Sequence, residues 1–158
     1  MNGKRWLPLG LFLLLAFAAA GLGALATATS VDTWYPTLQK PAWNPPNWLF
    51  GPVWTFLYIL MAVATWRVWR VSDSTQSRRT VSLYSAQLTL NALWSILFFG
   101  MRQPGLAFAE IIVLATVVTV IAWRFWRVDR IAATLWIPYV AWVIFAAVLN
   151  ATIWQLNR

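Results

Sequence analysis

Five long apolar stretches separated by short polar ones dominate the pattern of the chain. A helix needs about 20 mostly apolar residues to cross a hydrocarbon core about 30 Å thick, and each stretch is of that order. The predicted spans cover residues 6–26, 50–66, 81–101, 106–123 and 131–153. The connections 67–80, 102–105 and 124–130 are short and hold most of the charge, whereas 27–49 is long. We therefore expect an all-α membrane protein, a bundle of five transmembrane helices that forms one domain over residues 1–158.

Composition and charge agree with a membrane location. Apolar residues make up 61% of the chain and charged residues only 10%, where soluble domains carry about 25%. The net charge of +8 comes from so few charges that we expect no nucleic-acid partner. Nine of the twelve Lys and Arg residues lie in the N-terminus and in the second and fourth connections. The positive-inside rule then places the N-terminus in the cytoplasm and the long first connection outside, as expected for a bacterial cytoplasmic membrane.

The first apolar stretch admits a second interpretation. Lys4 and Arg5 followed by a Leu-rich run and an Ala-Leu-Ala sequence are typical of a cleaved secretory signal. The run is longer than the usual apolar core of a signal, so we expect a retained span. Its small residues recur at every fourth position, a spacing that favours close helix packing within the bundle or at the seam of a homodimer. These residues are Ala16, Ala20, Ala24 and Ala28.

The residue types that are missing exclude most catalytic chemistry. The chain has no Cys and no His, which rules out disulfides, thiolate and imidazole metal ligands, cysteine nucleophiles and a histidine base. We expect neither a metal site nor a required cofactor. In contrast, 13 Trp, 4 Tyr and 9 Phe exceed what two interfacial belts of a small protein need. This aromatic excess points to a binding function.

The long first connection combines aromatic residues with prolines. Residues 34–48 contain four prolines, which fix φ and bias the preceding residue to extended backbone. A stiff aromatic loop at the mouth of a helix bundle predicts a lid, with Lys40 supplying a charge at the mouth. The alternative is that Trp34, Trp43 and Trp48 only anchor the loop at the membrane surface.

Polar side chains within the predicted spans recur at helical spacing. They are expected to face the bundle interior, because exposing them to lipid is costly. Aromatic and amide groups on three helices predict a pocket for a flat, largely apolar ligand, although each amide alone also fits a role as interhelical glue. The stripes are Trp54, Tyr58, Met61 and Thr65; Gln87, Asn91, Trp94 and Ser95; and Tyr139, Trp142, Ala146, Leu149 and Asn150.

Glu110 is the only acidic residue within a predicted span. Three interpretations fit its position near the outer end of the fourth span: it reaches the interface, it pairs with Arg102, or it relays protons. An ion-driven transporter is not favoured, because the sequence lacks paired intramembrane charges and broken inverted repeats.

Three separated motifs resemble the TspO/MBR family, the tryptophan-rich sensory proteins of bacteria and the translocator proteins of mitochondria. They are WYPTLQKPAWNPPNWLFGPVWTFLY at residues 34–58, QLTLNALWSILFF at 87–99 and PYVAWVIFAAVLN at 138–150. The resemblance covers almost the whole chain. It implies a five-helix bundle, often dimeric, that binds porphyrins such as protoporphyrin IX. Animal members also bind cholesterol, which we do not expect here because residues 148–158 lack the Tyr of the cholesterol motif, itself a weak pattern.

The resemblance also implies which residues bind the ligand. The family's cavity positions correspond to Tyr35, Pro41, Trp54, Asn91, Trp94, Trp142, Ala146 and Leu149. With the stripe residues and one further loop residue, the candidate ligand-binding set is Tyr35, Pro41, Trp43, Trp54, Tyr58, Gln87, Asn91, Trp94, Tyr139, Trp142, Ala146, Leu149 and Asn150.

Three functional hypotheses follow. The first is a membrane protein that binds a porphyrin, metal-free because the chain lacks the usual haem ligands, and acts as a sensor or transporter. The second is light- and oxygen-dependent porphyrin degradation in the same pocket, with Trp54 and Tyr35 as the candidate catalytic residues by family resemblance. The third is a membrane anchor, or a subunit of a larger assembly, without a small-molecule ligand.

Overall fold

The computed structural model describes residues 3–158, and side chains from residue 6 onward, so Lys4 and Arg5 of the charge count lie outside the described side chains. Across this part of the chain the structure is helical and contains no strand. The long helices are α1 (Gly3–Ala28), α2 (Asn47–Val71), α3 (Ser74–Ser95), α4 (Pro104–Val128) and α5 (Arg130–Leu156). All five, α3 with the turn that follows it, are long and apolar enough to cross a membrane. The expected five-helix bundle is confirmed.

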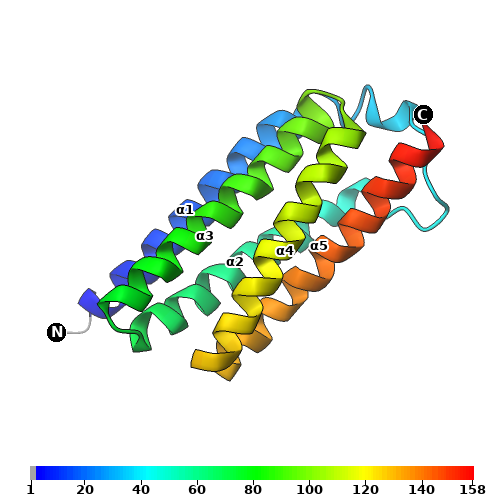
Figure 1. Cartoon of the computed structure of the whole chain (residues 1–158). Helices are drawn as coiled ribbons and strands as arrows, with labels where there is room; N and C mark the ends of the chain where they lie inside the picture. The colour runs from blue at the N-terminus through cyan, green and yellow to red at the C-terminus, as the bar shows by residue number, and fades with distance from the viewer. Residues whose placement is uncertain (1–2) are drawn as a thin grey trace.

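The helices alternate in direction and pack side by side (Figure 1). α1 contacts α2 and α3, α4 contacts α3 and α5, and α2 contacts α5, which closes the bundle around a shared core. The tight turns between α2 and α3 and between α4 and α5 lie at the same end as the start of α1, here called the arginine end. Residues 29–46, the turn at 101–103 and the C-terminus lie at the opposite end, the loop end.

The helices are longer than the apolar stretches that predict them. Residues 67–80 were expected to form a connection, but only residues 72–73 separate α2 from α3. Likewise only Asp129 separates α4 from α5, where 124–130 was expected. Helical hydrogen bonding does not stop where the apolar residues stop, because charged side chains on the extra turns reach water. Two of these arginines stack on indoles of the same helix: Arg70 lies 4.7 Å from the Trp66 ring and Arg127 4.4 Å from the Trp123 ring.

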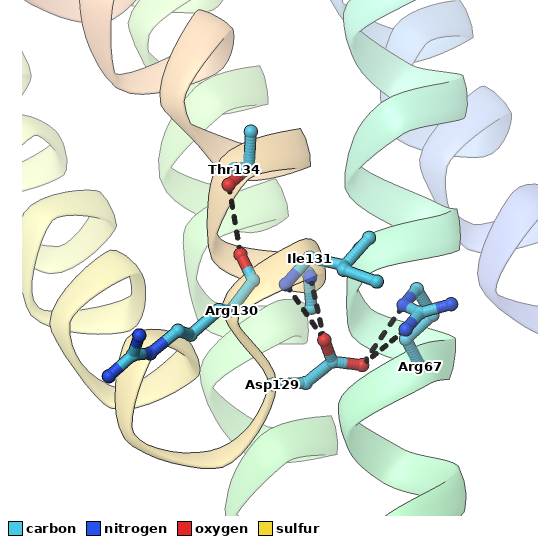
Figure 2. Close-up of polar contacts among 6 residues, drawn as sticks. Arg67, Asp129, Arg130, Ile131 and Thr134 are labelled. Carbon is cyan, nitrogen blue, oxygen red and sulfur yellow. Dashed lines mark hydrogen bonds and ion pairs between the residues drawn. The ribbon is translucent and has the colours of Figure 1, made fainter.

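Asp129 forms the sharp turn between α4 and α5 (Figure 2). Its Oδ1 accepts hydrogen bonds from the backbone N–H groups of Ile131 and Ala132 at 2.9 and 3.2 Å, which caps the first turn of α5. Its Oδ2 lies 2.9 Å from Nη2 of Arg67 on α2. One carboxylate therefore starts a helix and ties it to a neighbouring one.

The third span ends in a π-helical turn, η2 (Ile96–Gly100), instead of continuing as an α-helix to residue 101. The backbone N–H of Met101 donates to the carbonyl of Ile96 at 2.7 Å. Arg102 follows with φ of 53°, a left-handed conformation that is uncommon outside glycine. This turn carries Phe98 and Phe99, which line the cavity described below. In proteins generally, short π-helical turns are frequent at functional sites.

Candidate functional site

A cavity of about 520 Å³ occupies the loop-end half of the bundle. This volume lies within the range of about 300 to 1,000 Å³ that is typical of small-molecule sites. Along α2 the wall runs from Asn47 to Tyr58, about 16 Å at the rise of an α-helix. α1, α2, α3, η2 and α5 all contribute side chains, and none of the residues that line the cavity is charged.

Aromatic rings make up two walls of the cavity. On one side the Trp54 ring lies 5.4 Å from Tyr58 and 6.5 Å from Trp142, the latter at an interplanar angle of 86°. On the other side Trp94 stacks on Phe98 at 5.2 Å. The tilted, edge-to-face and stacked contacts fix the orientation of these rings, all of which belong to residues that line the cavity.

Several hydrogen-bonding groups of the wall already have partners. Trp94 Nε1 donates to Asn150 Oδ1 at 2.9 Å, and Asn150 Nδ2 donates to the carbonyl of Pro104 at 2.8 Å. Tyr58 donates to Asn91 Oδ1 at 2.8 Å. Among the described residues, the indole N–H groups of Trp54 and Trp142 have no hydrogen-bond partner. With the side chains of Ser95 and Asn47, which also line the cavity and have no hydrogen-bond partner among the described residues, they are the donors available to a ligand.

The long connection contributes Tyr35, which is buried in a short 3₁₀ turn, Tyr35–Thr37. Its ring lies 5.5 Å from Phe99, and its hydroxyl donates to Asn44 Oδ1 at 2.8 Å. Burial raises the pKa of the Tyr35 hydroxyl above its ordinary value, and the hydrogen bond to Asn44 only partly opposes this shift. Tyr35 therefore remains a neutral hydrogen-bond donor at physiological pH.

Lys40 holds the connection in shape instead of facing the cavity. Its Nζ donates to the carbonyls of Tyr35 and Leu38 at 2.8 and 2.9 Å and lies 4.9 Å from the Tyr35 ring. Lys40 as a charge at the cavity mouth stays a prediction: the ammonium lies beside Tyr35, which lines the cavity, but its hydrogen bonds go to the loop's own carbonyls. The connection is also fastened to α5: Gln39 N–H donates to Asn157 Oδ1, and Asn157 Nδ2 donates to the Gln39 carbonyl, both at 2.9 Å.

Most of the residues predicted from the sequence lie on the cavity wall. These are Tyr35, Trp54, Tyr58, Asn91, Trp94, Trp142, Ala146, Leu149 and Asn150. Pro41, Trp43, Gln87 and Tyr139 do not line it. Trp43 lies outside and packs against Phe145, whose ring is 5.8 Å away and does line the cavity. Gln87 and Tyr139 are fully buried among the helices, where Tyr139 donates to Gln87 Oε1 at 2.7 Å.

Sequence reasoning missed the wall that α1 provides. Ala20, Gly23, Ala24 and Ala28 all line the cavity, and only Ala16 of the small-residue stripe is fully buried. The spacing was visible in the sequence, but it was interpreted as helix packing or a dimer seam. In the structure the small side chains leave space that no other side chain fills. Phe98, Phe99 and Phe145, which no stripe included, complete the wall.

Comparison with known proteins places the chain among relatives of the same size. The model of the TspO/MBR family matches residues 12–155. The chain belongs to the TspO/MBR family. The tryptophan-rich protein TspO of Chlorobaculum tepidum is 40% identical over 98% of both chains. The tryptophan-rich sensory protein of Cereibacter sphaeroides is 40% identical over 92% of this chain and 91% of its own. The translocator protein of Bos taurus is 37% identical over 97% of this chain and 92% of its own.

Family membership and the five span-length helices together establish an integral, multi-pass membrane protein. Within this TspO/MBR protein, the cavity is enclosed by all three motifs on which the resemblance depends. Residues 34–58, 87–99 and 138–150 supply every predicted wall residue, whereas α1 adds a wall that those motifs do not contain.

Proposed function

We propose that this protein binds a porphyrin or a related tetrapyrrole in the cavity at the loop end, and acts as a sensor or transporter of that ligand. The observation that carries the proposal is an uncharged cavity with aromatic walls and unpaired indole N–H groups of Trp54 and Trp142. The names of its relatives, tryptophan-rich sensory protein and translocator protein, agree with either role.

The chemistry of the wall suits a flat macrocycle. Indole and phenyl faces stack on extended π systems, and the small residues of α1 leave room beside them. The two indole N–H groups are free to donate to ring nitrogens or to a carboxylate, because neither is engaged by the protein. The chain has no Cys and no His, so its chemistry favours a metal-free porphyrin over haem.

The long connection acts as a lid in this proposal. Tyr35 covers Phe98 and Phe99 at the mouth of the cavity, and the loop is fastened by Lys40 within itself and by Asn157 on α5. For the loop to open, the Gln39–Asn157 pair must be released and Tyr35 must also separate from Phe98 and Phe99. The orientation proposed from the arginine count sets this lid on the outer side of a bacterial cytoplasmic membrane.

The test is a titration of the protein with protoporphyrin IX in the dark. Binding is monitored through the absorbance of the porphyrin. Ala146→Trp fills the cavity, whereas Ala141→Trp places the same side chain on an exposed position of α5 away from it. We expect saturable binding that weakens at least about tenfold in Ala146→Trp and is retained in Ala141→Trp. Equal affinity in both variants would mean that the ligand binds outside this cavity. If the unmodified protein shows no saturable binding, the porphyrin proposal fails and the hypothesis of a membrane anchor without a ligand remains.

A second candidate function is photo-oxidation of the bound porphyrin. The placement of Trp54 and Tyr35 on the same cavity favours it, because an excited porphyrin and dioxygen would meet oxidisable side chains there. The protein would contribute positioning instead of acid-base groups. We expect protein-dependent loss of porphyrin absorbance under light and air that slows in Trp54→Phe. Bleaching at the same rate with and without protein would exclude this function.

A further inference from the structure

The seam between α1 and α2 is bridged by aromatic rings in the half of the bundle toward the arginine end. There the rings of Trp6 and Trp66 stack at a centroid distance of 5.0 Å. Midway along α1, the Phe17 ring lies 6.3 Å from the ring of Tyr58, the residue of α2 at which the cavity wall ends. Large side chains therefore join the two helices from the arginine end up to the bottom of the cavity.

Toward the loop end, the same seam carries small side chains. Ala24 and Ala28 follow Phe17 by seven and eleven residues, close to two and three helical turns, so they lie on the same side of α1. Thr55 precedes Trp66 by eleven residues and so lies on the side of α2 that faces α1.

These small residues line the cavity and are also exposed. Both statements hold for Ala24 and Ala28 of α1 and for Gly51 and Thr55 of α2. A Cβ added at Gly51 would meet no atom within 4 Å, so no neighbouring side chain fills the space beside it. The cavity therefore opens to the outside of the bundle between the loop-end halves of α1 and α2.

The edges of this opening are apolar at membrane depth. Thr55 Oγ1 donates to the carbonyl of Gly51 at 2.9 Å, and Thr27 Oγ1 donates to the carbonyl of Gly23 at 2.8 Å, so both hydroxyls are satisfied by their own helix. The polar residue Asn47 is the first residue of α2 and lies at the loop end of the cavity wall. Such edges suit contact with lipid, where an unsatisfied polar group is costly.

The route past the long connection is closed by contacts that the opening lacks. The bonds to α5 and the rings around Tyr35 hold the connection in place. In addition, Arg102 Nε donates to Ser30 Oγ at 3.3 Å, which joins the start of the connection to the turn before α4. Arg102 therefore does not form the pair with Glu110 that the sequence allows, and Glu110 has no partner among the described residues.

We propose that the ligand enters and leaves the cavity sideways, from the hydrocarbon of the membrane, through the opening between α1 and α2. This inference rests on the proposed ligand site and specifies the class of ligand, a flat amphiphile dissolved in the membrane. From Ala28 to Phe17 the opening extends about 16 Å along α1. A molecule with its carboxylates at the membrane surface and its rings in the hydrocarbon lies at this height. Its entry breaks none of the hydrogen bonds that hold the long connection.

Fluorescence quenching tests the opening without any ligand. The chain has no cysteine, so Thr55→Cys carries a unique thiol at the edge of the opening, which is labelled with bimane in vesicles. Asp32→Cys, at an exposed position of the long connection, is the control. We expect phospholipids with brominated acyl chains to quench the label on Thr55→Cys and aqueous iodide to quench the label on Asp32→Cys. A label on Thr55→Cys that brominated lipid does not quench would overturn the proposal.

Rates of binding test the route itself. Gly51→Leu places a larger side chain in the opening, and Gly21→Leu makes the same change at an exposed position of α1 outside the cavity. At either position an added Cβ meets nothing within 4 Å. With protoporphyrin IX and vesicles in the dark, we expect association and dissociation both to slow at least about fivefold in Gly51→Leu. Neither rate should change in Gly21→Leu.

The two rates together separate a blocked route from a damaged pocket. A blocked opening slows association and dissociation alike, whereas lost contacts in the pocket speed dissociation. Rates that Gly51→Leu leaves unchanged, or faster dissociation alone, would overturn the lateral route and leave the proposed ligand intact. Failure of protoporphyrin IX to bind the unmodified protein would refute the proposed ligand, and the bimane measurement would still decide whether the opening faces lipid.

Discussion

At the scale of single residues, Asn91 joins three helices through one side-chain amide. It accepts from Tyr58 of α2 and donates to Tyr139 of α5 while lying on α3. Asn91→Ala removes a partner from both tyrosines, and we expect a loss of about 1 to 2 kcal/mol of stability. Thermal unfolding in detergent measures it. Thr89→Ala on the exposed face of α3 is the control, and an equal loss there would contradict this role for Asn91.

Asp129 has two roles that substitution separates. Asp129→Asn keeps a side-chain oxygen for the α5 cap and removes the ion pair with Arg67, whose side chain is 26% exposed, so we expect a loss of at most about 1 kcal/mol. Asp129→Ala removes both and should cost a further 0.5 to 2 kcal/mol, roughly. The comparison is again thermal unfolding. Equal losses in the two variants would show that the cap contributes nothing.

Helical spacing predicted most wall residues but could not separate cavity from core. Tyr139 and Trp142 lie on one predicted stripe, yet Trp142 faces the cavity and Tyr139 is packed among helices. The stripe on a helix is wide enough for its residues to face different neighbours. The arrangement of the surrounding helices then decides whether a given residue faces the cavity or another helix. Gln87 lies below the cavity for the same reason, since it is one turn deeper than Asn91.

At the scale of elements, the approach of α4 to α5 depends on Gly105. A Cβ at this position would lie 3.0 Å from Nε1 and Cε2 of the rigid Trp154 ring. We expect Gly105→Ala to destabilise the protein by about 1 to 3 kcal/mol despite the better helix propensity of alanine. Gly21→Ala in α1, where a Cβ meets nothing within 4 Å, should be neutral or stabilising. Equal unfolding temperatures for the two variants would contradict the close packing.

The long connection is fastened to α5 by a pair of side-chain to backbone bonds. Asn157→Ala removes the acceptor of the Gln39 N–H group and the donor to its carbonyl. We expect hydrogen exchange at the Gln39 amide to accelerate severalfold, with no change in the middle of α4. Unchanged exchange at Gln39 would mean that the rest of the loop holds it in place.

Apolar length predicted the existence of five helices but not their ends. The prediction ended the second and fourth spans where charge began, whereas α2 and α4 each continue through two arginines. Backbone hydrogen bonding is satisfied within a helix in water as well as in lipid, so hydropathy marks the membrane-buried part of a helix and leaves its ends undefined. The π-helical turn η2 has no signal in the apolar pattern at all.

At the scale of the whole molecule, the cavity arises because small residues of α1 face aromatic side chains of α2, α3, η2 and α5. The aromatic excess of the sequence predicted a pocket, and family resemblance suggested a ligand for it, but neither identified α1 as a wall. A packing stripe and a cavity wall use the same small residues. Only the positions of α2, α3 and α5 around α1 show whether its small residues form a packing stripe or a cavity wall.

The most direct test of ligand binding in this cavity uses the absence of cysteine from the chain. Ala28→Cys places a unique thiol on the cavity wall. The control, Thr29→Cys, places a unique thiol at the next residue, which is exposed and does not line the cavity. The rate of alkylation by N-ethylmaleimide is measured in the dark with and without protoporphyrin IX. The account predicts that the porphyrin slows alkylation of Ala28→Cys and leaves Thr29→Cys unchanged. Alkylation of both variants at unchanged rates, under conditions where the porphyrin binds, would contradict it.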